Sequence, residues 1–223
     1  MGSLAELELL APATPSKVIC VGRNYREHAA EFGNSAPDEP LLFLKPPSSV
    51  IGPGADIHYP ALSKRIDPEA ELVIVIGREA HRVSAERAMA VIGGYTCGND
   101  VTARDIQKSD GQWTRGKGFD TFCPIGPWIE TELDASDLRV TCAVNGELRQ
   151  DGRTRDLIFP IPSLVEYISR FTRLLPGDLI MTGTPPGVAP MEVGQMVAVE
   201  VEGIGRLENR LVHEPTPESP RRP

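Results

Sequence analysis

Two glutamates stand two positions apart at the start of the most apolar segment of the chain. Glu69 and Glu71 lead into the run Leu-Val-Ile-Val-Ile at 72–76, and the period of two of a β-strand puts both carboxylates on one face. Beside a buried strand the two anions repel one another and lose hydration, and a divalent cation would relieve both costs. Spacing alone also allows two solvated glutamates at a strand end.

A third carboxylate, Asp100, ends another predicted strand in the string Cys-Gly-Asn-Asp at 97–100. Three carboxylates without a nearby His–Cys cluster suit a hard, oxygen-preferring ion such as Mg²⁺, Mn²⁺ or Ca²⁺, and they do not suit zinc. That Glu69, Glu71 and Asp100 meet in space is a hypothesis that the fold has to satisfy.

His28 and Glu31 lie three residues apart on a predicted helix and therefore share a face. A glutamate beside an imidazole orients the ring and raises its basicity, which is what a general base for water requires. The alternative is a surface histidine beside a surface glutamate. His58, His81 and His213 have no comparable neighbours and are interpreted as structural.

Lys117 and Arg104 are candidates for holding an anionic substrate or a developing negative charge. Lys117 stands in the glycine-flanked string Arg-Gly-Lys-Gly at 115–118, where a solvated surface lysine is the alternative. The segment Thr-Gly-Thr-Pro-Pro-Gly at 182–187 offers backbone N–H groups and hydroxyls that could bind a carboxylate, or it is only a turn.

The elements that position these residues are predicted to be many short strands and a few helices, which is a β-rich α+β domain. Asn145-Gly146 is the preferred type I′ turn of a hairpin, and Asn24 is a candidate helix cap. Residues 108–122 are rich in Gly, Lys and Asp without apolar periodicity, which predicts an exposed loop. Strands are expected at 17–21, 41–44, 69–77, 95–99, 127–130, 138–144, 147–149, 179–182, 197–201 and 206–212, and helices at 25–32, 84–89, 102–107 and 163–171.

Composition narrows the class of protein. The 223 residues suffice for one domain with a sizeable core, and the net charge of −8 argues against nucleic-acid binding. No apolar run approaches the ~20 residues of a membrane helix, and the first residues do not resemble a signal peptide. The four cysteines (Cys20, Cys97, Cys123 and Cys142) form no CxxC pair, so we expect buried thiols in a reducing cytoplasm.

Six blocks of sequence, taken in order, resemble the catalytic domain of the fumarylacetoacetate hydrolase family in its short, single-domain form. They cover roughly residues 17–213, which leaves an irregular N-terminal segment at 1–16 and a Pro-rich tail at 214–223 that we expect to be disordered. The blocks are Val-Gly-Arg-Asn-Tyr at 21–25 with His28 and Glu31, Phe-Leu-Lys-Pro-Pro-Ser-Ser at 43–49, Glu-Ala-Glu-Leu at 69–72, Gly-Asn-Asp-Val-Thr-Ala-Arg-Asp at 98–105, Lys-Gly-Phe-Asp-Thr-Phe-Cys-Pro at 117–124 and Thr-Gly-Thr-Pro at 182–185.

The resemblance implies a fold of layered, rolled β-sheets with a few short helices, usually in a homodimer. It implies Mg²⁺ or Mn²⁺ at the positions of Glu69, Glu71 and Asp100, and a pair formed by His28 and Glu31 that activates water. It also implies catalytic or substrate-binding positions at Lys117, Arg23, Arg104, Gln107 and Thr184.

The implied activity is hydrolysis of a C–C bond in acylpyruvates, which are 2,4-dioxo acids such as fumarylpyruvate or acetylpyruvate, through an enolate held by the metal. The acyl group would contact residues 33–40 and 108–118. Because the same enolate serves other reactions, an oxaloacetate-type decarboxylase and an isomerase of 2-hydroxyhepta-2,4-diene-1,7-dioate or 5-carboxymethyl-2-hydroxymuconate are alternatives. A catalytically silent binding module is a more remote one.

Overall fold

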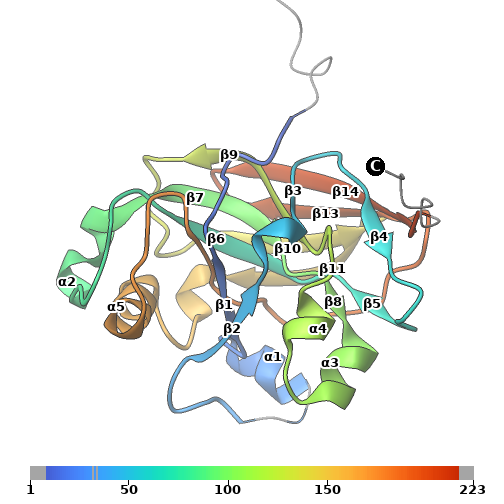
Figure 1. Cartoon of the computed structure of the whole chain (residues 1–223), viewed down its shortest axis with the longest axis horizontal. Coiled ribbons are helices and arrows are strands. Elements are labelled where there is room, and N and C mark those ends of the chain that lie inside the picture. The colour runs from blue at the N-terminus through green and yellow to red at the C-terminus, as the bar shows by residue number, and fades with distance from the viewer. Residues whose placement is uncertain (1–8, 32, 34, 216–223) are drawn as a thin grey trace, which may run out of the picture.

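Strands dominate the part of the chain that the computed structural model describes, residues 9–31, 33 and 35–215 (Figure 1). A seven-stranded sheet has the spatial order β2-β1-β12-β6-β7-β9-β3, and a five-stranded sheet has the order β11-β10-β13-β14-β4. β5 and β8 form a small third sheet. The predicted fold class, an α+β domain of layered, curled sheets, is confirmed.

The strands of the large sheet are β1 (Val18–Gly22), β2 (Leu41–Lys45), β3 (Val50–Ile51), β6 (Ala70–Ile76), β7 (Ile92–Asn99), β9 (Cys123–Glu130) and β12 (Leu179–Met181). Those of the second are β4 (Ile57–Tyr59), β10 (Arg139–Val144), β11 (Glu147–Arg153), β13 (Met196–Val201) and β14 (Gly205–His213), and the third pairs β5 (Ile66–Asp67) with β8 (Thr102–Ala103). The helices are α1 (Arg26–Glu31), α2 (Ala85–Ala88), α3 (Arg104–Asp110), α4 (Thr114–Lys117) and α5 (Ile161–Phe171), with 3₁₀ turns η2 (Pro47–Ser49), η3 (Met89–Val91) and η4 (Thr154–Asp156).

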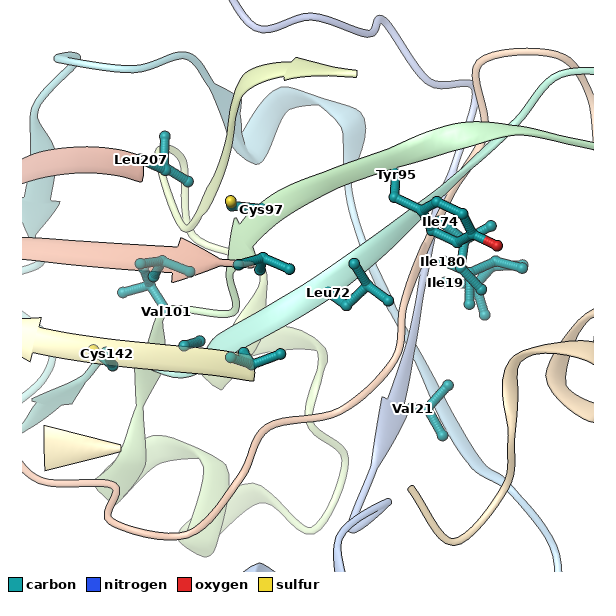
Figure 2. Packing of buried hydrophobic residues seen from close by; sticks show 14 of the residues in the cluster. Ile19, Val21, Leu72, Ile74, Tyr95, Cys97, Val101, Cys142, Ile180 and Leu207 are labelled. Atoms are coloured by element: carbon teal, nitrogen blue, oxygen red, sulfur yellow. The ribbon is translucent and has the colours of Figure 1, made fainter. Parts of the chain in front are cut away.

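The apolar run of β6 is continuous because both of its faces are buried. Leu72 and Ile74 join the main core between the sheets, whereas Val73 and Val75 join a second cluster on the opposite face of the same strand. Figure 2 shows Leu72 and Ile74 packed with residues of β1, β7 and β12. A strand that is covered on both faces has an unbroken run of hydrophobic residues. Burial on both faces also fixes the position of β6 within the large sheet.

The N-terminal segment is tied to the large sheet by one buried carboxylate. Asp178, just before β12, accepts hydrogen bonds from the hydroxyl of Ser16 at 2.6 Å, from the ammonium of Lys17 and from the backbone N–H of Leu175 at 2.7 Å. Residues 9–16 contain no helix or strand. The parts of the predicted segment and tail at 1–8 and 216–223 lie outside the described residues, and the domain boundaries stay predictions.

Several local predictions are confirmed. Asn145 and Gly146 both have positive φ, 49° and 81°, as a type I′ turn requires, and they join β10 to β11. All four cysteines are buried and unpaired. Within the described part of the chain, no helix has the length and apolarity to cross a membrane.

Two local predictions are wrong. Residues 108–122 are not an exposed loop, because they contain α4 and bury Lys117 and Phe122. The segment folds inward both to pair the charge of Lys117 and to bury Phe122, and these two residues give no hydrophobic periodicity that could predict it. Asn24 does not cap α1, because its side-chain amide bonds the distant backbone at Phe159 and Thr182.

Candidate active site

All ten residues singled out in the sequence line one cleft of about 610 Å³. The cleft lies where α1, α3 and α4 gather at one end of the molecule, next to β1 and β2 (Figure 1). Residues separated by more than a hundred positions in the chain therefore meet in one place. They are Arg23, His28, Glu31, Glu69, Glu71, Asp100, Arg104, Gln107, Lys117 and Thr184.

The three carboxylates are brought together by the pairing of β6 with β7. Glu71 in β6 lies opposite Gly98 in β7, and the N–H of Asp100 donates to the carbonyl of Glu69 at 2.9 Å. One oxygen atom from each of Glu69, Glu71 and Asp100 lies within 4.8 Å of the others, and all three residues are buried. The hypothesis that they meet in space is confirmed by this geometry.

Glu69 is held by two cationic side chains. Lys117 Nζ donates to Glu69 Oε2 at 2.6 Å, and the guanidinium of Arg104 donates to Oε1. Burial alone would raise the pKa of Glu69, but the charges of Lys117 and Arg104 outweigh it and hold the pKa well below its usual range. Glu69 is therefore an anion throughout the physiological pH range.

Glu71 has much weaker support. The N–H of Gly183 donates to its Oε2 at 2.7 Å, while burial and the neighbouring charges of Asp100 and Glu69 raise the pKa of Glu71 well above its usual value. Asp100 Oδ1 is buried with the ammonium of Lys45 2.7 Å away, so Glu71 is the member of the cluster whose charge is least compensated. Buried carboxylates that repel one another are costly, and their clustered oxygens fit a hard divalent cation such as Mg²⁺ or Mn²⁺.

His28 and Glu31 face the same cleft from α1. His28 Nδ1 lies 3.4 Å from Glu31 Oε2, and Glu31 also accepts a hydrogen bond from the N–H of Gly187 at 3.2 Å. Burial lowers the pKa of His28, against the opposing charge of Glu69. The imidazole is therefore neutral at neutral pH and able to accept a proton.

Arg104 is held so that it positions Glu69. Its Nε donates to Asp67 at 2.8 Å, and its Nη1 donates to the side chain of Gln107 at 2.7 Å. Because Asp67 is fully buried in β5, the guanidinium plane is fixed. The sequence analysis did not identify Asp67 as a site residue, because nothing in the sequence except its charge distinguishes it.

Thr184 is fixed by a second buried network. Its hydroxyl donates to the carbonyl of Ala70 at 2.9 Å and accepts from Gln150 Nε2 at 2.8 Å. The other end of the Gln150 amide accepts from the N–H of Ala70 at 2.9 Å. Gln150, from the second sheet, thereby joins the Thr184 loop to the start of β6, and no sequence signal indicates this role.

Lys45 is the most consequential residue that the sequence analysis missed. Only 1% of it is exposed, and its ammonium donates to the carbonyls of Val101, Lys117 and Phe122. Its Nζ also lies 2.7 Å from Asp100 Oδ1. Three buried carboxylates require buried cations to offset their charge. A lysine at the end of an apolar strand was therefore the feature of the sequence that could have identified Lys45.

The fumarylacetoacetate (FAA) hydrolase C-terminal family matches residues 17–212 of the chain. The chain belongs to this family. Among its relatives, the structure of a 5-carboxymethyl-2-hydroxymuconate delta-isomerase from Mycobacterium smegmatis is 52% identical with a TM-score of 0.90, over 97% of this chain and 87% of that chain. The human mitochondrial oxaloacetate tautomerase FAHD2A is 41% identical over 93% of this chain and 70% of its own length.

A third relative bears on the metal. The structure of fumarylpyruvate hydrolase from Pseudomonas aeruginosa, in complex with Mn²⁺ and pyruvate, is 33% identical with a TM-score of 0.86 and covers 96% of this chain and 99% of that chain. The fumarylacetoacetate hydrolase family thus includes members that bind a divalent metal, and the cluster of Glu69, Glu71 and Asp100 could hold one here.

Proposed function

We propose that the protein is a divalent-metal-dependent hydrolase that cleaves a C–C bond in acylpyruvate-type 2,4-dioxo acids. The observation that carries the proposal is a buried His28, paired with Glu31, in the same cleft as three clustered carboxylates. A neutral imidazole with a lowered pKa suits the activation of water, and the carboxylates suit Mg²⁺ or Mn²⁺.

Glu69, Glu71 and Asp100 would hold the metal, which when bound acts as a Lewis acid toward the oxygen atoms of a 2-oxo acid. Lys117 and Arg104 keep the Glu69 carboxylate in place through their hydrogen bonds. Lys117 also donates to Asp100 Oδ2 at 2.6 Å. These contacts preorganise the ligand oxygens before the metal arrives.

His28 would take a proton from water while Glu31 orients the ring through Nδ1, which leaves Nε2 toward the reacting water. The resulting hydroxide adds to the carbonyl at position 4, and the bond between carbons 3 and 4 breaks. The electron pair passes to the pyruvate half, where Lys117 would stabilise the negative charge until His28 returns its proton to carbon 3. The products are pyruvate and the carboxylic acid of the acyl group.

Isomerisation or tautomerisation is the second candidate, and the names of two relatives favour it. The isomerase from M. smegmatis and the human oxaloacetate tautomerase are 52% and 41% identical to this chain, whereas the fumarylpyruvate hydrolase is 33% identical. These reactions move a proton next to a carbonyl and need no addition of water. Decarboxylation of an oxaloacetate-type acid is the third candidate reaction. A catalytically silent binding module is disfavoured, because the named relatives are enzymes.

The expected homodimer and the cytoplasmic location stay predictions. Neither enters the proposed chemistry, because every residue that it uses lines one cleft of a single chain.

Product analysis distinguishes the candidates. The protein with Mg²⁺ is given several 2,4-dioxo acids, oxaloacetate and a 2-hydroxymuconate, and the products are identified by mass. Pyruvate plus a carboxylic acid indicates hydrolysis, CO₂ indicates decarboxylation and an isobaric product indicates isomerisation. Full activity after removal of divalent metal by a chelator would refute all three.

A histidine variant tests the water-activation step. His28→Ala should abolish hydrolysis, whereas His81→Ala, at an exposed histidine outside the cleft, should leave it unchanged. Hydrolysis at the wild-type rate in His28→Ala would exclude the histidine as the base. Decarboxylation that survives the change would show that this reaction does not need His28.

A further inference from the structure

Two buried lysines contact the two carboxylate oxygens of Asp100, and they differ in how their N–H groups are used. The ammonium of Lys45 lies beside Oδ1 and donates to three backbone carbonyls. Lys117 Nζ donates to Asp100 Oδ2 and to Glu69 Oε2, each at 2.6 Å. Because an ammonium has three N–H groups, one N–H of Lys117 has no acceptor among the residues that the structure describes.

The aromatic ring of Phe43 is the further contact of this ammonium. Lys117 Nζ lies over the ring, 5.0 Å from its centre, and both residues line the cleft. A cation within about 6 Å of the centre of a ring face is attracted to it, and more strongly where water is excluded. Lys117 is only 2% exposed, so water competes little with this contact.

Strand β2 restrains both ends of Lys117. Phe43 and Lys45 are two positions apart in β2 and share a face of the strand. Phe43 contacts the ammonium of Lys117, and Lys45 donates to the backbone carbonyl of the same residue. Phe43 is itself held by its strand partner Cys20 in β1 and by the ring of Trp113, which it meets edge-on at 5.3 Å.

The remaining N–H of Lys117 can serve the proposed chemistry only if its direction is fixed. A lysine carries a compact ammonium on a flexible four-carbon stem, so the side chain needs restraints from its surroundings. Two of them are the carboxylates of Glu69 and Asp100, which are also candidate metal ligands. The ring of Phe43 offers no oxygen ligand, so its hold on the ammonium does not compete with a metal ion.

We propose that Phe43 is a positioning residue for Lys117. The face of its ring holds the ammonium beside Glu69 and Asp100 and keeps the third N–H available to the substrate. The inference rests on the proposed function only in the step where Lys117 stabilises the negative charge of the pyruvate half. Such a role depends on the negative potential of the ring face, whereas a packing role depends on the shape of the ring.

Fluorination of the ring separates these two roles. Phenylalanine with one, two or three fluorine atoms, incorporated at position 43, keeps nearly the same shape while the negative potential of the ring face falls in steps. Urea denaturation with a chelator present gives a readout that needs neither substrate nor metal. We expect the equilibrium constant of unfolding to rise in steps, by about fivefold or more across the series. A packing role alone predicts no such rise, because fluorine makes the ring more apolar.

Two matched controls assign the effect to Lys117. The same series in the Lys117→Met background should change the unfolding constant by less than about twofold, because no ammonium then faces the ring. The same series at Phe119 should be equally flat, because this half-buried ring contacts the ring of Phe122 at 5.2 Å and no cation among the described residues. The Phe119 series decides the question if Lys117→Met does not fold.

Turnover of a 2,4-dioxo acid is the second readout. We expect kcat to fall with each added fluorine, by about tenfold across the series. KM should change by less than about twofold, because Lys117 acts on a charge that develops after the substrate has bound. Phe43→Leu keeps an apolar side chain without a ring face and should lose at least as much of kcat.

The inference is overturned if stability does not respond to fluorination at position 43, or if the Phe119 series responds equally. A kcat that stays constant across the series in an active protein also overturns it. Failure of the proposed function gives a different result. Stepwise loss of stability that depends on Lys117, in a protein that converts none of the offered substrates, removes the reaction and leaves the contact between ring and ammonium in place.

Discussion

The buried ammonium of Lys45 gives the most direct test of the electrostatic structure beneath the cleft. Lys45→Met removes the charge and keeps a side chain of similar length. It removes one donor from each of the carbonyls of Val101, Lys117 and Phe122, and it takes away the cation 2.7 Å from Asp100 Oδ1. All of these groups are buried, so water does not replace the lost contacts.

The size of the effect follows from those contacts. A hydrogen bond to a charged group contributes about 1.5–3 kcal/mol, and removal of one partner of a buried ion pair costs about 3–5 kcal/mol. The two costs overlap because one ammonium makes every contact. We therefore expect the free energy of unfolding to fall by about 3–5 kcal/mol, a large part of the ~5–15 kcal/mol of a typical domain.

Urea denaturation followed by circular dichroism measures this change. A chelator is present throughout, so that metal binding adds nothing to the stability of the folded state. Lys64→Met, at an exposed lysine, is the matched control and should change the free energy by less than about 0.5 kcal/mol. A loss below about 1 kcal/mol in Lys45→Met would refute the assignment of Lys45 as a buried charge partner.

Three further predictions concern other buried polar groups. Glu71→Gln should weaken Mg²⁺ binding at least about tenfold in calorimetric titration. It should not lower the stability of the metal-free protein, because it relieves repulsion from Asp100. A variant that binds Mg²⁺ with wild-type affinity would contradict this prediction. Burial raises the pKa of Asp178, but hydrogen bonds, chiefly from Lys17, outweigh it and lower the pKa. Its stabilisation is therefore complete above the unfolded value of about 3.9 and is lost as the pH falls through the lowered folded value. Asp178→Asn should cost about 2 kcal/mol at neutral pH, with the difference from wild type shrinking in acid denaturation series; a constant difference would exclude the linkage. Gln150→Leu should cost about 1–3 kcal/mol in urea denaturation, because it leaves buried groups of the Thr184 loop and β6 unpaired; unchanged stability would contradict this.

Local periodicity indicated that two of the three metal-binding candidates share a face, whereas their meeting with Asp100 was a hypothesis supported by the family resemblance. A strand alternates its side chains strictly, so the spacing of Glu69 and Glu71 decides that they share a face. The helix that carries His28 and Glu31 is likewise set by neighbours along the chain. For Lys117, Arg104, Gln107 and Thr184, the family resemblance rather than any periodicity indicated the site, and the cleft brings these residues together.

The charge pairing beneath the cleft was beyond local reasoning. Lys45 bonds the carbonyls of Val101 and Lys117, which lie 56 and 72 positions away. Residues 108–122 looked solvated because their composition is polar, yet Lys117 is only 2% exposed. A charged residue is buried only when another part of the chain supplies its partner, and that partner has no fixed sequence separation.

The sequence by itself determined the chemistry that is possible: oxygen ligands for a hard cation, an imidazole–carboxylate pair and the strands that carry them. Only the tertiary structure decided how those groups are supported and what encloses them. It placed Lys45 under Asp100 and Trp113 under the guanidinium of Arg23. Periodicity acts between neighbours in the chain, whereas burial and charge compensation act between neighbours in space.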